Sequence, residues 1–180
     1  SMSDSPDDIA ATRYRTSFYN RYFKRFKAPE SWFYPGALLK DKTKMFIARS
    51  NCDVGVFINR NFVKATNTLV VISSEEDLFL FDYTRSLLKS HGSFGIVAKM
   101  STTTPGHDQI LKELWDFVSS IPQTQLLPDK DLTPGLFNSY NFMLIGYNTW
   151  NDVSEHRKEA LQKMPSTLIL NKNKRSSSDN

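Results

Sequence analysis

The stretch that decides the fold is residues 67–98, NTLVVISSEEDLFLFDYTRSLLKSHGSFGIVA. It begins with the apolar, β-branched run TLVVI (68–72) and ends with FGIVA (94–98), and both runs are too short for helices. Between them, Asp77–Ser90 carries leucine and phenylalanine at helical spacing. A strand, a helix and a strand in succession favour a parallel pair joined by a crossover helix. The sequence therefore predicts an α/β fold with a central, mainly parallel sheet flanked by helices.

A second unit with the same order follows. It consists of a predicted strand at 140–147, a helix over Asp152–Lys163 and a strand at 166–170. Between the two units, Gln109–Ser120 has the apolar spacing of an amphipathic helix, which Pro122 ends. Two successive strand–helix–strand units suggest a duplicated or two-lobed α/β architecture.

The residues before the first unit have a different character. MFIA (45–48) and VGVFI (54–58) predict two strands. Residues 12–27 predict a helix, because aromatic side chains recur every fourth residue at Tyr14, Phe18, Tyr22 and Phe26, with lysine and arginine between them. We expect this aromatic face to dock on the rest of the domain.

The positive charge is concentrated in the N-terminal quarter. The whole chain has a net charge of +4, whereas residues 13–49 hold ten lysines and arginines against Glu30 and Asp41. Basic residues that alternate with aromatic ones suit an anionic partner such as nucleic acid, or equally a solubilising surface. The candidate nucleic-acid-binding residues are Arg13, Arg15, Arg21, Lys24, Arg25 and Lys27.

Composition excludes several classes of protein. Hydrophobic residues make up 39% of the chain, which is typical of a globular protein. No apolar run approaches the ~18–20 residues of a membrane span, so we expect no membrane partner. The single cysteine, Cys52, and three scattered histidines predict no disulfide framework and no metal site, and fit a reducing, intracellular setting. Glycine-rich phosphate loops and motifs of catalytic serine or metal sites are absent, so we expect neither a cofactor nor an enzyme.

The segment LWDFVSSIP (114–122) resembles the last helix of a BRCT domain, in which a buried tryptophan precedes a small residue by four positions. Trp115 and Ser119 match that pair, so the resemblance implies that they belong to the core. The preceding segments NTLVVIS (67–73), DYTRSLLKSHG (82–92) and SFGIVAK (93–99) follow the order of a BRCT repeat. Residues 126–147 are similar to the linker and first strand of a second repeat.

The resemblance implies a division of the chain. Residues 1–11 are expected to be disordered, 12–39 to form the basic aromatic helix and its connector, and 40–122 to form the first BRCT-like unit. A linker at 123–135, a second half-unit at 136–170 and a disordered tail at 171–180 complete this division. The pattern departs from the family between residues 48 and 68, at the insertion 101–114, and where the second repeat stops after its second strand.

The same resemblance implies a non-enzymatic interaction module. BRCT-like modules bind phosphoserine or phosphothreonine peptides, so the expected function is phosphopeptide recognition in a nuclear, chromosome-associated complex of the DNA-repair, checkpoint or kinetochore type. Ser50 and the N–H group of Asn51, with Arg85 and Lys89 one helical turn apart, would bind the phosphate. The alternative explanation is that Ser50 ends a strand and the two cations are exposed.

Two further functions remain open from the sequence. The first is a nucleic-acid-binding module that uses the basic N-terminal segment. The second is a small α/β enzyme or pseudoenzyme with a cleft at the carboxyl ends of its strands. The acidic run Glu75–Asp77 is expected to supply negative charge to the start of the following helix, and Cys52 is expected to be chemically inert.

Overall fold

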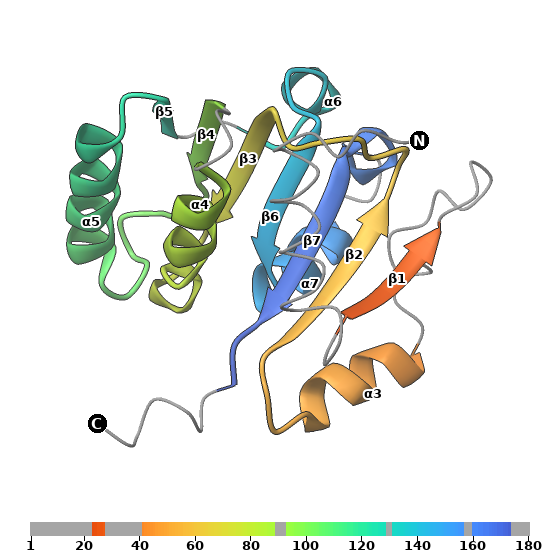
Figure 1. Ribbon diagram of the computed structural model, residues 1–180. Helices are drawn as coiled ribbons and strands as arrows, with labels where there is room; N and C mark the ends of the chain where they lie inside the picture. The colour runs from red at the N-terminus through yellow and green to blue at the C-terminus, as the bar shows by residue number, and fades with distance from the viewer. Residues whose placement is uncertain (1–22, 28–40, 89–92, 129–130, 157–159, 174–180) are drawn as a thin grey trace.

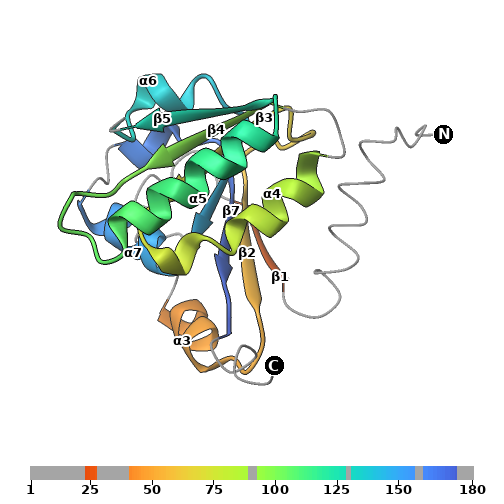
Figure 2. The same ribbon diagram turned by 90° about the vertical axis from the view of Figure 1, so that its left-hand side faces the viewer.

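The fold is built on a single seven-stranded sheet with helices on both faces (Figures 1 and 2). The computed structural model describes residues 23–27, 41–88, 93–128, 131–156 and 160–173. The strands lie in the order β1-β2-β7-β6-β3-β4-β5. All neighbouring strands are parallel except β2 and β7, which are antiparallel. The prediction of an α/β fold with a mostly parallel sheet is confirmed.

Strands and helices alternate along most of the chain. The strands are β1 (Phe23–Lys27), β2 (Val54–Asn59), β3 (Asn67–Ile72), β4 (Ser93–Ala98), β5 (Thr124–Pro128), β6 (Phe142–Gly146) and β7 (Ser166–Asn171). The helices are α3 (Asp41–Arg49), α4 (Leu80–Leu88), α5 (His107–Ser120), α6 (Pro134–Phe137) and α7 (Tyr147–His156). Two 3-10 turns, η1 (Glu75–Asp77) and η2 (Ala160–Lys163), complete the described elements.

Side chains of the buried strands point alternately to the two faces of the sheet and belong to two separate cores. In β3, Leu69 and Val71 face one core, and Val70 and Ile72 face the other. The first core includes Ile47 of α3 and the apolar faces of α6 and α7, whereas α4 and α5 cover the second. Because both faces of the sheet are covered, its central strands are continuously hydrophobic, as expected for parallel sheets.

The two strand–helix–strand predictions are confirmed, but their partners are not those of two separate units. β3 pairs in parallel with β4 across α4, and β6 pairs in parallel with β7 across α7. β3 also pairs directly with β6, so both units belong to one sheet. None of the described helices is long and apolar enough to cross a lipid bilayer.

Three local predictions are wrong. MFIA (45–48) lies within helix α3, and of these four residues only Ile47 is buried, whereas Met45 and Phe46 are exposed. Residues 23–27 form an edge strand instead of the end of the basic helix, and the remainder of that predicted helix lies outside the described residues. The predicted linker contains the edge strand β5, which pairs with β4. In each case a short apolar or amphipathic run is compatible with both states, and contacts with the rest of the fold decided between them.

The prediction that Trp115 and Ser119 belong to the core is wrong as well. The buried side of α5 consists of Ile110, Leu114 and Phe117. Trp115 is one residue, or about 100° of helix rotation, beyond Leu114, and it is 55% exposed. Ser119 is also exposed. The large tryptophan of the core is instead Trp150 of α7, which is 1% exposed.

Candidate functional site

The sheet changes its direction of growth between β3 and β6. From β3 the chain proceeds outward to β4 and β5, and it then returns to place β6 and β7 on the other side of β3. The carboxyl ends of β3 and β6 therefore lie side by side, and the helices that follow them depart to opposite faces of the sheet. In open α/β sheets this arrangement leaves a crevice outside the strand ends, where ligands bind.

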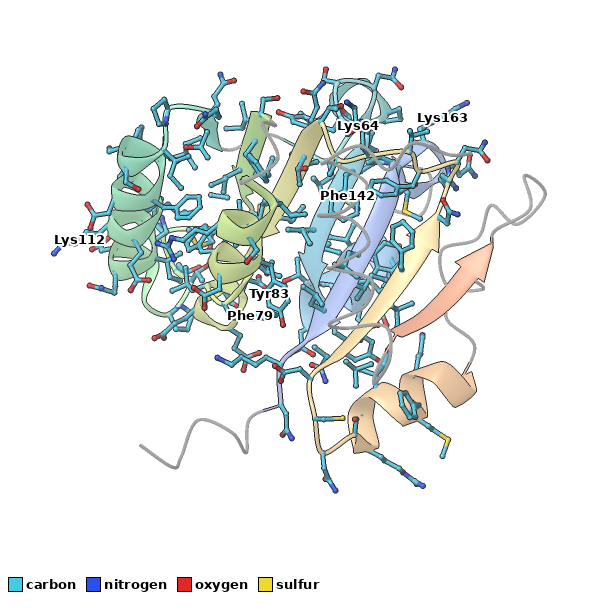
Figure 3. The ribbon with its side chains drawn as sticks, viewed as in Figure 1. Lys64, Phe79, Tyr83, Lys112, Phe142 and Lys163 are labelled. Carbon is cyan, nitrogen blue, oxygen red and sulfur yellow. The ribbon has the colours of Figure 1, made fainter. Side chains whose placement is uncertain are left out.

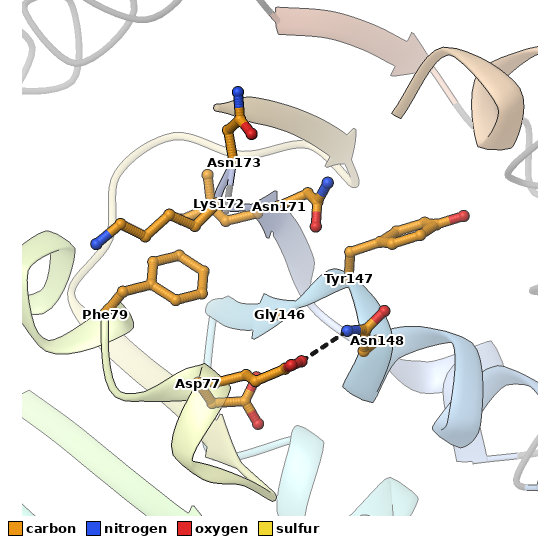
Figure 4. A pocket seen from close by; sticks show the side chains of 10 residues that line it. Asp77, Phe79, Gly146, Tyr147, Asn148, Asn171, Lys172 and Asn173 are labelled. Carbon is orange, nitrogen blue, oxygen red and sulfur yellow. Dashed lines mark hydrogen bonds between the residues drawn. The ribbon is translucent and has the colours of Figure 1, made fainter. Parts of the chain in front are cut away.

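A cavity of about 180 Å³ lies at this point (Figure 4). Its lining comes from the carboxyl ends of three neighbouring parallel strands and from the residues that follow them. Those residues are Glu76, Asp77 and Phe79 after β3, Gly146, Tyr147 and Asn148 at the β6–α7 junction, and Leu170, Asn171, Lys172 and Asn173 at the end of β7.

Asp77 is the central polar side chain of the cavity, and only 3% of its surface is exposed. Its Oδ2 atom accepts hydrogen bonds from the N–H (2.8 Å) and hydroxyl (3.0 Å) of Ser73 and from the hydroxyl of Thr149 (2.7 Å). The N–H of Ser74 approaches the same oxygen at 3.3 Å. These bonds connect the end of β3 to the first turn of α7, so Asp77 joins the two sides of the crevice.

Burial raises the pKa of the Asp77 carboxyl, although its hydrogen bonds with Ser73, Thr149 and Ser74 oppose that shift. The two hydroxyls also contact each other, because Ser73 Oγ and Thr149 Oγ1 are 2.5 Å apart and each contacts Asp77 Oδ2.

Gly146 makes room for Asp77. A Cβ atom at position 146 would lie closer than 3.0 Å to Asp77 Oδ1, a separation that real Cβ atoms do not adopt. The glycine at the end of β6 therefore lets the carboxylate approach the backbone at the β6–α7 junction. Glu76 forms a second connection beside it, because its Oε2 accepts a hydrogen bond from Asn148 Nδ2 at 2.9 Å (Figure 4).

Phe79 lines the cavity on the β3 side. Phe79 lies next to Tyr83 in an edge-to-face contact with ring centroids 6.0 Å apart (Figure 3). Burial and the nearby charges of Asp53 and Asp82 raise the pKa of Tyr83 to about 12, so its phenol stays protonated. Lys172 lies above Phe79, and its Nζ atom lies on the far side of that ring from Asn148 (Figure 4).

The predicted phosphate-binding residues do not contact one another in the described part of the chain. The Ser50 hydroxyl contacts Cys52 Sγ at 2.9 Å, and Asn51 is exposed. Arg85 forms an ion pair with Asp82 at 3.3 Å and lies over the Phe117 ring at 5.0 Å. Lys89 lies outside the described residues. Phosphate binding at this set of residues stays a prediction.

The Ser50 segment nevertheless lies at the same edge of the sheet as the cavity. Asn173, which lines the cavity, donates its backbone N–H to Asp53 Oδ1 at 2.7 Å. The amide of Asn171 approaches the Ile47 carbonyl of α3 at 3.4 Å. Of the candidate nucleic-acid-binding residues, Arg13, Arg15 and Arg21 lie outside the described residues, and Lys24, Arg25 and Lys27 are in β1.

Together, the sheet order and the cavity define an open, doubly wound α/β domain with a crevice at its switch point. Comparison with protein-family models and with curated protein sequences gives no match. The fold is similar to the crystal structure of a universal stress protein from Archaeoglobus fulgidus, with a TM-score of 0.56. That match has 11% sequence identity and covers 93% of this chain and 67% of the other. At this identity the similarity establishes the fold alone.

The expectation of a BRCT-like module is therefore wrong. The structural match is to a universal stress protein, and the tryptophan that carried the BRCT resemblance is exposed. Phosphopeptide recognition in a chromosome-associated complex is wrong with it, because that function was inferred from the resemblance. Nuclear localisation stays a prediction.

Asp77 is not among the site residues predicted from the sequence. The run Glu75–Asp77 was expected to supply negative charge to the start of the next helix, whereas in the structure Asp77 accepts a hydrogen bond from Thr149, 72 residues away. A usable signal was present, because polar residues directly follow two predicted parallel strands, at Ser73 and at Asn148. The carboxyl ends of parallel strands share one edge of a sheet, so these positions are expected to meet.

Proposed function

We propose that this protein is a small-molecule-binding α/β domain, without enzymatic activity, whose ligand occupies the cavity at the β3–β6 switch point. The observation that carries this proposal is the position of the cavity at the carboxyl ends of β3, β6 and β7. Ligand sites of open α/β sheets concentrate at such points because the diverging helices leave a crevice there.

The polar lining supports binding at a fixed orientation. Asp77 and Glu76 are held by Thr149 and Asn148 before any ligand arrives. A ligand therefore meets groups that are already positioned, which lowers the entropy cost of binding. Asp77 Oδ2 and Glu76 Oε2 are engaged in hydrogen bonds that join the two sides of the crevice. We therefore assign these two side chains to shaping the binding site and not to proton transfer.

A pair of glycine variants tests the proposal. Gly146→Ala places a methyl group against Asp77 Oδ1 and should distort the cavity, at a cost of about 1–3 kcal/mol in the free energy of unfolding. Gly135→Ala is the matched control, because the nearest atom to a Cβ at this position would be Thr133 Oγ1, at an ordinary contact distance of 3.9 Å. The control should be neutral or slightly stabilising.

Binding is measured by screening a fragment library by protein-observed NMR on the wild type and both variants. We expect fragments that shift the backbone amides of Phe79, Asn148 and Asn171, with the shifts lost in Gly146→Ala and kept in Gly135→Ala. Far-UV circular dichroism verifies that both variants remain folded. Fragments that bind only elsewhere, or that bind Gly146→Ala as well as the wild type, would contradict the proposal.

A further inference from the structure

We propose that the cavity binds a small organic cation of the amidinium, guanidinium or ammonium class, with the cationic group beside the carboxylates of Asp77 and Glu76. This inference rests on the proposed function and specifies its ligand. It also reverses the usual arrangement of doubly wound folds, in which an anionic phosphate binds at the helix that follows the switch-point strand.

Carboxylates already surround the place where a phosphate would bind. Helix α7 starts at Tyr147, directly after the last residue of β6, so no glycine-rich loop separates strand from helix. Glu76 bonds to the side chain of Asn148 and Asp77 to that of Thr149, both in the first turn of α7. These acidic groups complement the positive end of the helix dipole. An added phosphate would be repelled by them at short range.

Asp77 also has an acceptor atom without a donor among the described residues. Its Oδ2 atom takes all the hydrogen bonds of this side chain among the described residues, and Oδ1 takes none. Asp77 is 3% exposed and lines the cavity. An Asp77 oxygen that lines the cavity and has no donor among the described residues favours a ligand that brings an N–H group, and a charged donor gives the stronger bond.

Phe79 forms a wall of the cavity. An aromatic face next to carboxylates is a favourable environment for an organic cation, because the ring quadrupole attracts positive charge. The cavity of about 180 Å³ is smaller than the ~300–1,000 Å³ of drug-sized sites, so it suits a single ring or a short chain.

Lys172 does not neutralise this site. It is exposed and makes no ion pair with any residue that the structure describes. Its ammonium group lies beyond the Phe79 ring, on the side away from Asn148 (Figure 4). A cationic ligand would therefore meet the carboxylates first, with Lys172 as a like charge at the rim.

Three probes of nearly equal shape test the charge preference. These are benzamidine, which is cationic, benzamide, which is its neutral counterpart, and phenyl phosphate, which is anionic. Their dissociation constants for the full chain are measured by isothermal titration calorimetry, with amide shifts from NMR to locate binding. We expect benzamidine to bind about tenfold or more tightly than benzamide, as for one charge-assisted contact, and phenyl phosphate to bind more weakly than either.

Variants then assign the effect to residues. Asp77→Asn and Glu76→Gln should each weaken benzamidine binding by about threefold to thirtyfold and leave benzamide binding nearly unchanged. Lys172→Ala should strengthen benzamidine binding or leave it unaltered. Asp116→Asn, which removes an exposed carboxylate from α5, is the control and should change nothing. Because Glu76 is exposed, its variant stays informative if Asp77→Asn does not fold.

The outcomes separate the two proposals. If benzamide or phenyl phosphate binds in the cavity as tightly as benzamidine, the cation preference is wrong and the binding function stands. If none of the three probes binds but fragments of another class shift the cavity amides, the cation preference is again wrong. If no fragment of any class occupies the cavity, the proposed function fails, and the inference fails with it.

Discussion

Asp77 shows how one residue can both hold a fold together and define its site. Its carboxyl group joins β3 to α7 through Ser73 and Thr149, and Gly146 provides the space for it. The same burial that makes these bonds strong disfavours the ionised form, so the pKa of Asp77 is raised. The stability of the protein should therefore depend on the ionisation of this group.

We predict that Asp77→Asn removes one pH-dependent contribution to stability. Below the ordinary pKa of 3.8, Asp77 is protonated in both the folded and the unfolded states. As the pH rises from there through the raised folded-state pKa, the unfolded state ionises first, so the free energy of unfolding of the wild type falls relative to that of the variant. Above that window the difference is constant.

The measurement is urea denaturation of both proteins between pH 3 and pH 8. Asp116→Asn, which removes an exposed carboxylate from α5, serves as the control. A wild-type stability that rises relative to Asp77→Asn across the window would mean that hydrogen bonding to the carboxylate outweighs its burial.

At the scale of elements, helix α5 shows that the register of a helix decides which large residue stabilises it. Ile110, Leu114 and Phe117 face the sheet, and Phe117 stacks on Phe81 of α4 with ring centroids 4.4 Å apart. Arg85 also lies over the Phe117 ring, 5.0 Å from its centroid. Trp115 is the largest side chain of the helix, but it points to solvent.

We expect the neighbouring variants Leu114→Ala and Trp115→Ala to differ sharply. Leu114→Ala opens a cavity in the core and should lower the free energy of unfolding by about 2–5 kcal/mol. Trp115→Ala removes an exposed side chain and should change it by less than about 1 kcal/mol. Chemical denaturation of the two variants measures both values. Equal losses would show that Trp115 is covered in solution.

At the scale of the whole molecule, we expect the strands at the switch point to be the most stable part of the sheet. β3 and β6 lie in its middle and are hydrogen-bonded on both sides, whereas β5 lies at one edge and, among the described strands, pairs only with β4. The candidate site therefore lies at the ends of the most central strands of the sheet.

Native-state hydrogen exchange should follow this order. The amides of Val70, Val71, Leu144 and Ile145 are expected to exchange only through global unfolding, and those of β5 through smaller, local openings. Exchange monitored by NMR at several low urea concentrations distinguishes the two routes. Protection in β5 equal to that in β3 would indicate that this edge is covered by another chain.

The sequence by itself determined those elements whose pattern is local. β3, β4, β6, β7 and α5 were predictable, because their apolar periodicity or β-branched runs reflect the burial of each segment. The parallel β3–β4 and β6–β7 pairs followed, because a helix between two strands favours that connection. The motif resemblance misled, because a tryptophan and a serine four residues apart do not indicate which side of α5 is buried.

The tertiary structure alone decided the strand order, the edge strands β1 and β5, and the helical state of MFIA (45–48). It also decided the site, because Asp77 and Thr149 are 72 residues apart and meet only when β6 pairs with β3. The physical reason is the range of the interactions. The periodicity of a segment indicates how that segment is buried. Strand order and the cavity depend instead on the free energies of contacts between distant segments, which cannot be inferred from the sequence of any one of them.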